Sequence, residues 1–138
     1  MCGGTIRAEM SGSIEVPNHS TNGPITCVWK IISVGNLLSY SIDALDIASD
    51  SNDNCTKDYV EVAEVFPMYG MSGPNAIVRS ENHRRYCASN FNGTNGVTTV
   101  TASDQLQVTL NSTRNIGRAS QKYFKLFFRT IYQGRIIF

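Results

Sequence analysis

The sequence has little of what enzymes, metalloproteins and membrane proteins usually need. It has only two histidines, and neither G-x-S-x-G nor H-E-x-x-H occurs, so the common hydrolase and zinc-peptidase motifs are missing. No run approaches the ~20 apolar residues of a membrane-spanning helix. The net charge of +1 gives no global attraction for nucleic acid. We therefore expect no catalytic residue, no cofactor, no bound nucleic acid and no insertion into a membrane.

The sequence also lacks helical periodicity, since no stretch of ten or more residues shows a convincing 3.6-residue period. Short β-rich runs alternate instead with clusters of Gly, Pro, Asn and Ser. The predicted strands cover residues 26–33, 37–47, 58–65, 97–102, 105–112 and 122–131. We expect a bulge at Ala44–Leu45, where the alternation shifts phase, and a tight hairpin at Ser103–Asp104. A chain of 138 residues with this pattern predicts one antiparallel two-sheet β-sandwich, with Trp29 in its core.

The spacing of the four cysteines does not fit the usual zinc pattern. No two of them form a C-x-x-C pair, whereas zinc ligands commonly stand two to four residues apart. An even number without such pairs indicates disulfides, and the sequence alone allows three pairings. The four residues are Cys2, Cys27, Cys55 and Cys87.

Four N-x-S/T sequons occur where 12 Asn and 25 Ser plus Thr predict about two by chance. The candidate glycosylation sites are Asn18, Asn54, Asn92 and Asn111. Disulfides and N-glycosylation both belong to secreted proteins, so we expect an extracellular location. Met1 is followed directly by Cys2, with no signal peptide. We interpret this start as that of a mature module carrying a start methionine rather than of a cytosolic protein.

Several short motifs, taken together and in order, resemble the CUB domain family. They are Cys2-Gly3-Gly4, then Gly12-Ser13-Ile14 before Pro17, then C-x-W-x-I at Cys27 to Ile31, a partial L-D-I-E segment at Leu45 to Ala48, C-x-x-D-Y-V-E-V at Cys55 to Val62, Cys87 about thirty residues on, and aromatic alternation from Tyr123 to Phe128. The resemblance covers nearly the whole chain. It implies a CUB-like jelly-roll sandwich over residues 2–131, with residues 132–138 as a C-terminal extension or linker.

The resemblance also carries expectations about pairing and function. It implies two disulfides, Cys2–Cys27 and Cys55–Cys87. It implies a non-catalytic extracellular module of a larger secreted or cell-surface protein, such as a receptor or a protease-associated protein, which binds an extracellular protein. The alternative is a free-standing secreted adhesin, similar to the spermadhesins, that binds a protein or an acidic glycan.

One loop is a candidate for partner binding. Residues 65–75 follow a predicted strand and contain Pro and Gly, yet they carry apolar side chains that give adaptable contact area. The candidate anchors are Met68, Tyr69 and Met71. In the alternative interpretation these side chains tuck under the loop against the edge of the sheet.

Two basic clusters are further candidates, because positive charge attracts an acidic protein or a sulfated glycan. The first contains Arg79, His83, Arg84 and Arg85, of which Arg84 and Arg85 are the candidate partner-binding residues; the second contains Arg114, Arg118 and Lys122. The alternative for both is an ordinary solvated surface. The two histidines, His19 and His83, are expected in solvated loops.

Many CUB domains hold a calcium ion with three acidic residues, and only one of these positions is clearly kept, as Asp58. Ala48 stands at the first position, and the third falls near residues 111–113, which contain no carboxylate. Calcium needs six to eight oxygen ligands, and its affinity depends on their charge. The alternative is a site rebuilt with the nearby Asp46, Asp50 and Asp53. We expect no metal site, with Cys55 as a disulfide anchor at a strand entrance and Asp58 bonded to the adjacent turn.

Overall fold

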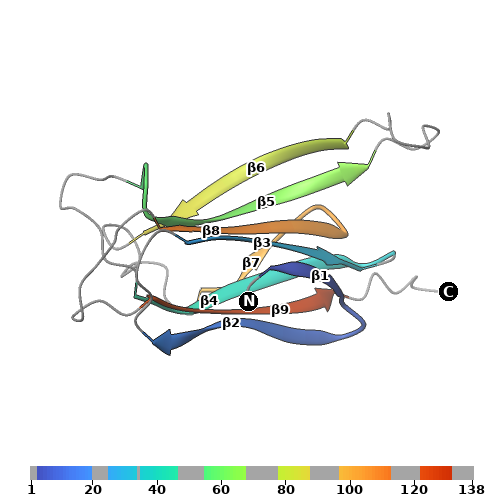
Figure 1. The fold of residues 1–138 in the computed structure, drawn as a ribbon. Helices are drawn as coiled ribbons and strands as arrows, with labels where there is room; N and C mark the ends of the chain where they lie inside the picture. The colour runs from blue at the N-terminus through green and yellow to red at the C-terminus, as the bar shows by residue number, and fades with distance from the viewer. Residues whose placement is uncertain are drawn as a thin grey trace, which may run out of the picture.

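A computed structural model of the protein describes residues 3–19, 25–33, 35–46, 55–67, 78–87, 97–112 and 122–131. In these residues the backbone forms nine strands and no helix, and therefore no helix long and apolar enough to cross a membrane. The strands lie in two layers that face each other (Figure 1). The predicted all-β two-sheet sandwich is confirmed.

The strands alternate irregularly between the two layers. They are β1 (Gly4–Arg7), β2 (Ser11–His19), β3 (Ile25–Ile32), β4 (Leu37–Asp46), β5 (Tyr59–Pro67), β6 (Val78–Tyr86), β7 (Thr99–Val100), β8 (Gln105–Ser112) and β9 (Lys122–Ile131). One sheet has the order β1-β3-β8-β5-β6 and the other β2-β9-β4-β7. The described strand pairs are antiparallel except β1 with β3, which is parallel.

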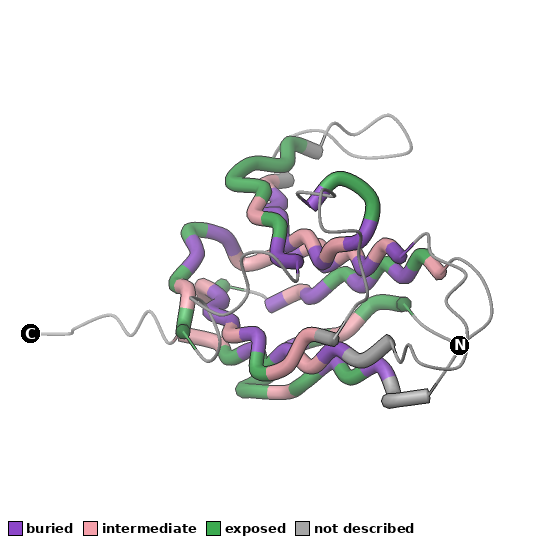
Figure 2. The backbone as a smooth tube through the Cα atoms, turned by 90° about the vertical axis from the view of Figure 1, so that its left-hand side faces the viewer, coloured by how far each residue is buried: buried purple, intermediate pink, exposed green. Residues whose placement is uncertain are grey.

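The core lies between the two layers because alternate residues of each strand point inward. The burial pattern alternates along β3, β8 and β9, and Figure 2 shows buried and exposed positions succeeding one another along the chain. Trp29 of β3 is 7% exposed, and its ring centroid lies 5.9 Å from that of Phe124 on β9. The predicted core position of Trp29 is confirmed.

The predicted hairpin at Ser103–Asp104 is wrong. Residues 97–102 contain only the two-residue strand β7, which pairs with β4, whereas β8 lies in the other sheet. The chain therefore crosses between the layers at this point. Two buried hydroxyl groups fix the path of the chain there. Thr101 Oγ1 donates to Leu38 O at 2.5 Å, and Ser103 Oγ donates to Val65 O. Because these hydrogen bonds reach a strand of each sheet, two runs that look like a hairpin in the sequence separate in space.

Strand β6 was not predicted, and the expectation that His83 and His19 lie in loops is wrong for both. His83 lies on β6, and His19 ends β2. Strand β6 is an edge strand rich in charged residues, which is how native sheets protect an edge from pairing with another chain. It carries a bulge opposite Ala63, where Asn82 has a φ of 54°, and this bulge breaks the alternation that would reveal the strand.

The remaining local predictions concern the β4 bulge and the cysteines. The register of β4 against β9 shifts between Ile42 and Ala44, so the bulge is confirmed. Cys55 and Cys87 form the expected disulfide, with Cα atoms 5.4 Å apart, and it ties the entrance of β5 to the end of β6. Cys27 is also disulfide-bonded, and its expected partner Cys2 lies outside the described residues.

Candidate functional site

The predicted partner-binding residue Arg85 lies on the outer face of the five-stranded sheet. Its Nε is 2.9 Å from Glu61 Oε1, its Nη1 donates to Cys55 O at 3.0 Å, and its guanidinium lies 4.0 Å from the centroid of the Tyr59 ring. The hydrogen bond with Glu61 is the main cause of a raised Arg85 pKa. Arg85 is therefore tied to the entrance of β5 beside the disulfide.

The neighbouring Arg84 points the other way, toward the space between the sheets. Its Nη1 lies 3.2 Å from Oε2 of Glu64, whose side chain is only 2% exposed, and Glu64 Oε1 accepts a hydrogen bond from the Ala102 N–H at 2.7 Å. A buried carboxylate is tolerated only when it is paired in this way. Close by, the hydroxyls of Tyr40 and Tyr86 are 2.7 Å apart, and burial, followed by this contact, raises the Tyr40 pKa.

His83 lies in a short chain of polar contacts on the outer face. Its Nδ1 is 3.3 Å from Glu61 Oε2, and its Nε2 is 3.2 Å from Ser80 Oγ. Burial is the largest single influence on the Glu61 pKa, and it raises the pKa. The contacts with Arg85 and His83 lower it by more in total, so the Glu61 pKa lies below its usual value. The order Ser–His–Glu resembles a hydrolytic triad, but a triad acts in a site that excludes water and stabilises an oxyanion. The His83 side chain is 48% exposed on an edge strand, so we assign it no catalytic role.

The predicted basic cluster is largely neutralised by carboxylates. Glu61 and Glu64 pair with Arg85 and Arg84, and Arg79 Nε lies 3.2 Å from Glu81 Oε1. The positive charge that motivated the prediction is therefore compensated within the domain. The role of Arg84 and Arg85 in binding a partner stays a prediction.

Several other predicted residues lie outside the described residues. They are the loop anchors Met68, Tyr69 and Met71, the glycosylation sites Asn54 and Asn92, the aspartates Asp50 and Asp53, and the cluster at Arg114 and Arg118. Asn18 lies on β2. Asn111 lies on β8, where its Oδ1 accepts a hydrogen bond from Thr26 at 2.9 Å and its Nδ2 donates to Lys57 O at 2.8 Å. Use of the four glycosylation sites stays a prediction.

The described part of the chain does not assemble a calcium site. Asp58 is buried at the entrance of β5, and no group of three His, Cys, Asp or Glu side chains in the described residues could hold a metal ion. The nearby Asn111 already uses its side-chain oxygen within the sheet. One carboxylate is a poor fit to calcium. The expectation of no metal site stays a prediction, because part of the candidate set is outside the described residues.

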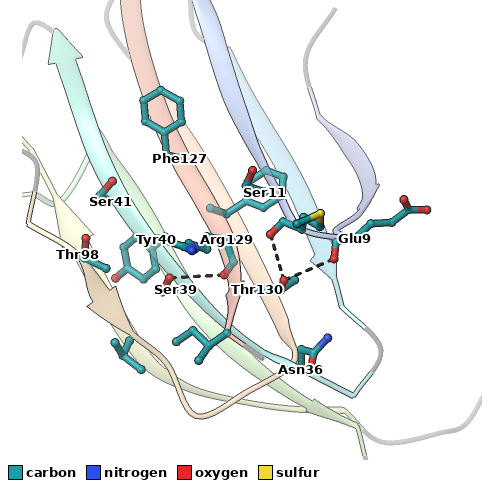
Figure 3. Close-up of a pocket in the computed structure, with 14 residues that line it drawn as sticks. Glu9, Ser11, Asn36, Ser39, Tyr40, Ser41, Thr98, Phe127, Arg129 and Thr130 are labelled. Carbon is teal, nitrogen blue, oxygen red and sulfur yellow. Dashed lines mark hydrogen bonds between the residues drawn. The ribbon is translucent and has the colours of Figure 1, made fainter. Parts of the chain in front are cut away.

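The outer face of the four-stranded sheet carries an open groove of about 940 Å³ that the sequence did not reveal (Figure 3). Strand register explains it. Arg129 of β9 is flanked by Ser11 of β2 and Ser39 of β4, while Phe127 is flanked by Ser41 on β4. Small serines on the two neighbouring strands leave the large β9 side chains standing above the sheet, and the space beside them is the groove. We call this surface the four-strand groove.

Exposed apolar side chains gather at the four-strand groove. Five large apolar residues in the described part of the chain are exposed, and three of them line it: Met10 at 77%, Val100 at 62% and Phe127 at 40%. Val28, at 44% exposure, lies on the outer face of the other sheet. Exposed apolar residues that cluster, rather than scatter singly, mark interaction sites.

The charges of the groove differ from those of β6. Arg129 forms no ion pair with any residue that the structure describes, and the same holds for Glu9, which also lines the groove. Lys125 stands four residues before Arg129 on β9. Its Nζ lies 3.5 Å from Glu15 Oε2 and 5.0 Å from the centroid of the Phe127 ring. The groove therefore offers an exposed aromatic ring and a guanidinium that no described carboxylate neutralises.

The only signal for this surface in the sequence is weak. The run KYFKLFFRTI places Phe124, Leu126 and Phe128 on the inner face, so Phe127 is an aromatic residue on the face that should be polar. The serines beside it belong to strands about 85 and more than 110 residues earlier in the chain, and only the register brings them together.

The described residues thus form a two-sheet β-sandwich with an open groove on the outer face of one sheet. The chain belongs to the CUB domain family, whose model matches residues 2–128. CUB domains are protein–protein interaction modules of extracellular proteins. No curated protein is significantly similar to this sequence.

Solved structures show the same fold at low sequence identity. The CUB1-EGF-CUB2 domains of rat MASP-1 match with a TM-score of 0.65 and 15% identity, covering 94% of this chain and 42% of that one. The full extracellular region of zebrafish Gpr126/Adgrg6 matches with a TM-score of 0.63 and 19% identity, covering 94% of this chain and 15% of that one. The MASP-1 CUB2 domain bound to Ca²⁺ matches with a TM-score of 0.56 and 18% identity, covering 93% and 99%. This chain thus spans less than half of the first two structures.

Proposed function

We propose that this domain is a non-catalytic extracellular recognition module that binds a partner protein through the four-strand groove. The observation that carries the proposal is that exposed apolar residues gather on one face with Arg129, which pairs with no carboxylate in the described part of the chain. Aromatic residues, Met and Arg are the types enriched at the centres of protein interfaces, where Lys and Glu are depleted. Phe127, Met10 and Arg129 fit this composition, whereas the charged residues of β6 are already paired within the domain.

The proposal places the domain in a larger secreted or cell-surface protein. Two observations support this. The similar structures from MASP-1 and Gpr126 contain the fold as a part of longer extracellular chains. The Cys55–Cys87 disulfide belongs to an oxidising compartment. The lack of catalysis is supported by the exposure of His83, the one histidine that contacts both a hydroxyl and a carboxylate among the described residues.

A capture experiment with matched variants tests the proposal. The oxidised domain is immobilised and exposed to a panel of extracellular ectodomains, alongside Phe127→Ser and the control Val28→Ser. The two substitutions remove similarly exposed apolar side chains from opposite faces of the sandwich. The proposal expects a partner that wild type and Val28→Ser retain and Phe127→Ser loses. Retention by all three, or loss only with Val28→Ser, would place the binding surface elsewhere.

A further inference from the structure

The candidate glycosylation site Asn111 lies near the end of β8, on the outer face of the five-stranded sheet. Its partners in register are Thr26 of β3 and Tyr59 of β5, while the preceding Leu110 points into the core. The Asn111 side chain is half-exposed. The folded sheet therefore leaves this side chain in contact with solvent, as an attached sugar requires.

The Asn111 side-chain amide is held at both ends, yet one of its N–H groups remains available. Its Oδ1 accepts a hydrogen bond from Thr26 Oγ1 at 2.9 Å, and its Nδ2 donates to Lys57 O at 2.8 Å. An asparagine amide nitrogen carries two N–H groups, and Nδ2 has no second acceptor among the described residues. The hydrogen bond to Lys57 O turns this nitrogen toward the entrance of β5.

We propose that Asn111 carries an N-linked glycan whose first sugar lies over the entrance of β5, beside Lys57 and Tyr59. The residues Asn111-Ser112-Thr113 form the acceptor sequence. Transfer joins Nδ2 to C1 of N-acetylglucosamine, breaks the bond from C1 to the pyrophosphate of a lipid-linked oligosaccharide, and releases one proton from Nδ2. The remaining N–H can keep the hydrogen bond to Lys57 O, so the modified side chain fits the folded sheet. The inference goes beyond the proposed function, which concerns the opposite face.

The surroundings of Asn111 suit a hydrated sugar better than a protein partner. The Tyr59 ring is already covered by the guanidinium of Arg85 at 4.0 Å, and Arg85 is paired with Glu61. The exposed large apolar side chains of the described residues lie elsewhere, on β3, β7 and β9 and at positions 10 and 97. A glycan keeps its hydroxyl groups in water and needs no apolar surface to be removed from it. At this point it would shield the β5 entrance and leave the four-strand groove open.

Occupancy is measured on the domain secreted from a eukaryotic cell line. A peptide N-glycosidase in heavy-oxygen water converts each glycosylated Asn into a labelled Asp, which peptide mapping by mass spectrometry locates. The Asn111 peptide should carry the label in most molecules. Thr113→Ala, which removes the acceptor sequence but keeps Asn111, should abolish the label there, and Thr113→Ser, which preserves that sequence, should retain it. An unlabelled Asn111 peptide from the secreted wild-type domain would overturn the inference.

Hydroxyl-radical footprinting of the secreted wild-type and Thr113→Ala domains tests where the sugar lies. Tyr59 should be oxidised at least about twofold more slowly in the glycosylated domain, because a bulky group covers it. Phe127, on the outer face of the other sheet, should be oxidised equally in both. Equal oxidation of Tyr59 with Asn111 occupied would overturn the proposed position of the glycan. Either failure leaves the proposed function intact, since that is tested separately by capture with Phe127→Ser.

Discussion

Arg84 and Glu64 join the edge strand β6 to the interior of the sandwich, with Nη1 3.2 Å from Oε2. Because the carboxylate is buried and also accepts the Ala102 N–H, Arg84 is its main source of compensating charge in the described structure. Arg84→Ala should therefore lower the free energy of unfolding by about 2 kcal/mol, below the range for fully buried pairs because the guanidinium is partly exposed. Urea denaturation measures this. Arg79→Ala, which breaks an exposed pair with Glu81, should cost less than about 0.5 kcal/mol.

The Tyr40–Tyr86 contact, which links a strand of each sheet, predicts a loss of stability at high pH. Burial and the contact with Tyr86 raise the folded Tyr40 pKa above the unfolded value of about 10. As pH rises, Tyr40 therefore loses its proton in the unfolded state first. Its contribution to the free energy of unfolding is fully present below pH ~10 and falls as pH rises above that value. The melting temperature should be flat from pH 7 to 9 and fall beyond 10. Tyr40→Phe should flatten the alkaline limb; an unchanged limb would show that other groups control it.

The cysteines give a prediction about redox state. Thiol titration of the denatured, unreduced protein should find essentially no free thiol, because Cys27, Cys55 and Cys87 are all disulfide-bonded. The Cys55–Cys87 bond spans 32 residues, so replacing both with Ala should lower the free energy of unfolding by roughly 3.5 kcal/mol in the chain-entropy model. Two or more free thiols per chain would contradict the extracellular assignment.

Calcium should have no effect on the domain. Asp58 is the one carboxylate clearly kept from the calcium-binding pattern of CUB domains, and one is too few for useful affinity. Melting temperatures in millimolar calcium and in chelator should be equal, and calorimetry should detect no heat of binding. A rise of several degrees with calcium that disappears in Asp58→Ala would show that the loop aspartates complete a site.

The sequence predicted the fold where strands bury one face. Strand β8 alternates cleanly because its inner residues Leu106, Val108 and Leu110 are apolar and its outer residues are polar. Strands β3 and β9 also turn apolar residues inward, although Val28 and Phe127 stand on their outer faces. Strand β6 escaped prediction because its inward Arg84 is a charged residue satisfied by Glu64 from a neighbouring strand, and because the bulge at Asn82 shifts its phase. The hairpin at Ser103 failed for a similar reason: hydroxyl bonds to distant strands decide the path there.

The four-strand groove could not be predicted because it exists only through register. Phe127 is conspicuous in the sequence as an aromatic residue on an outer face, but the serines that isolate it come from β2 and β4. The sequence pointed instead to Met68, Tyr69 and Met71, which lie outside the described residues. Tyr69→Ala, expected from the sequence to weaken binding by roughly 2 kcal/mol, remains a separate prediction that can be compared with the groove variants.

The most direct test of the groove as the recognition surface is the dissociation constant of a captured partner, measured by titration calorimetry for wild type, Phe127→Ser and Val28→Ser. We expect Phe127→Ser to weaken binding by about thirtyfold, as loss of a central aromatic anchor does, with little change in melting temperature. Val28→Ser should bind within about twofold of wild type, because single apolar side chains away from an interface contribute little. Equal dissociation constants for Phe127→Ser and wild type would contradict the account.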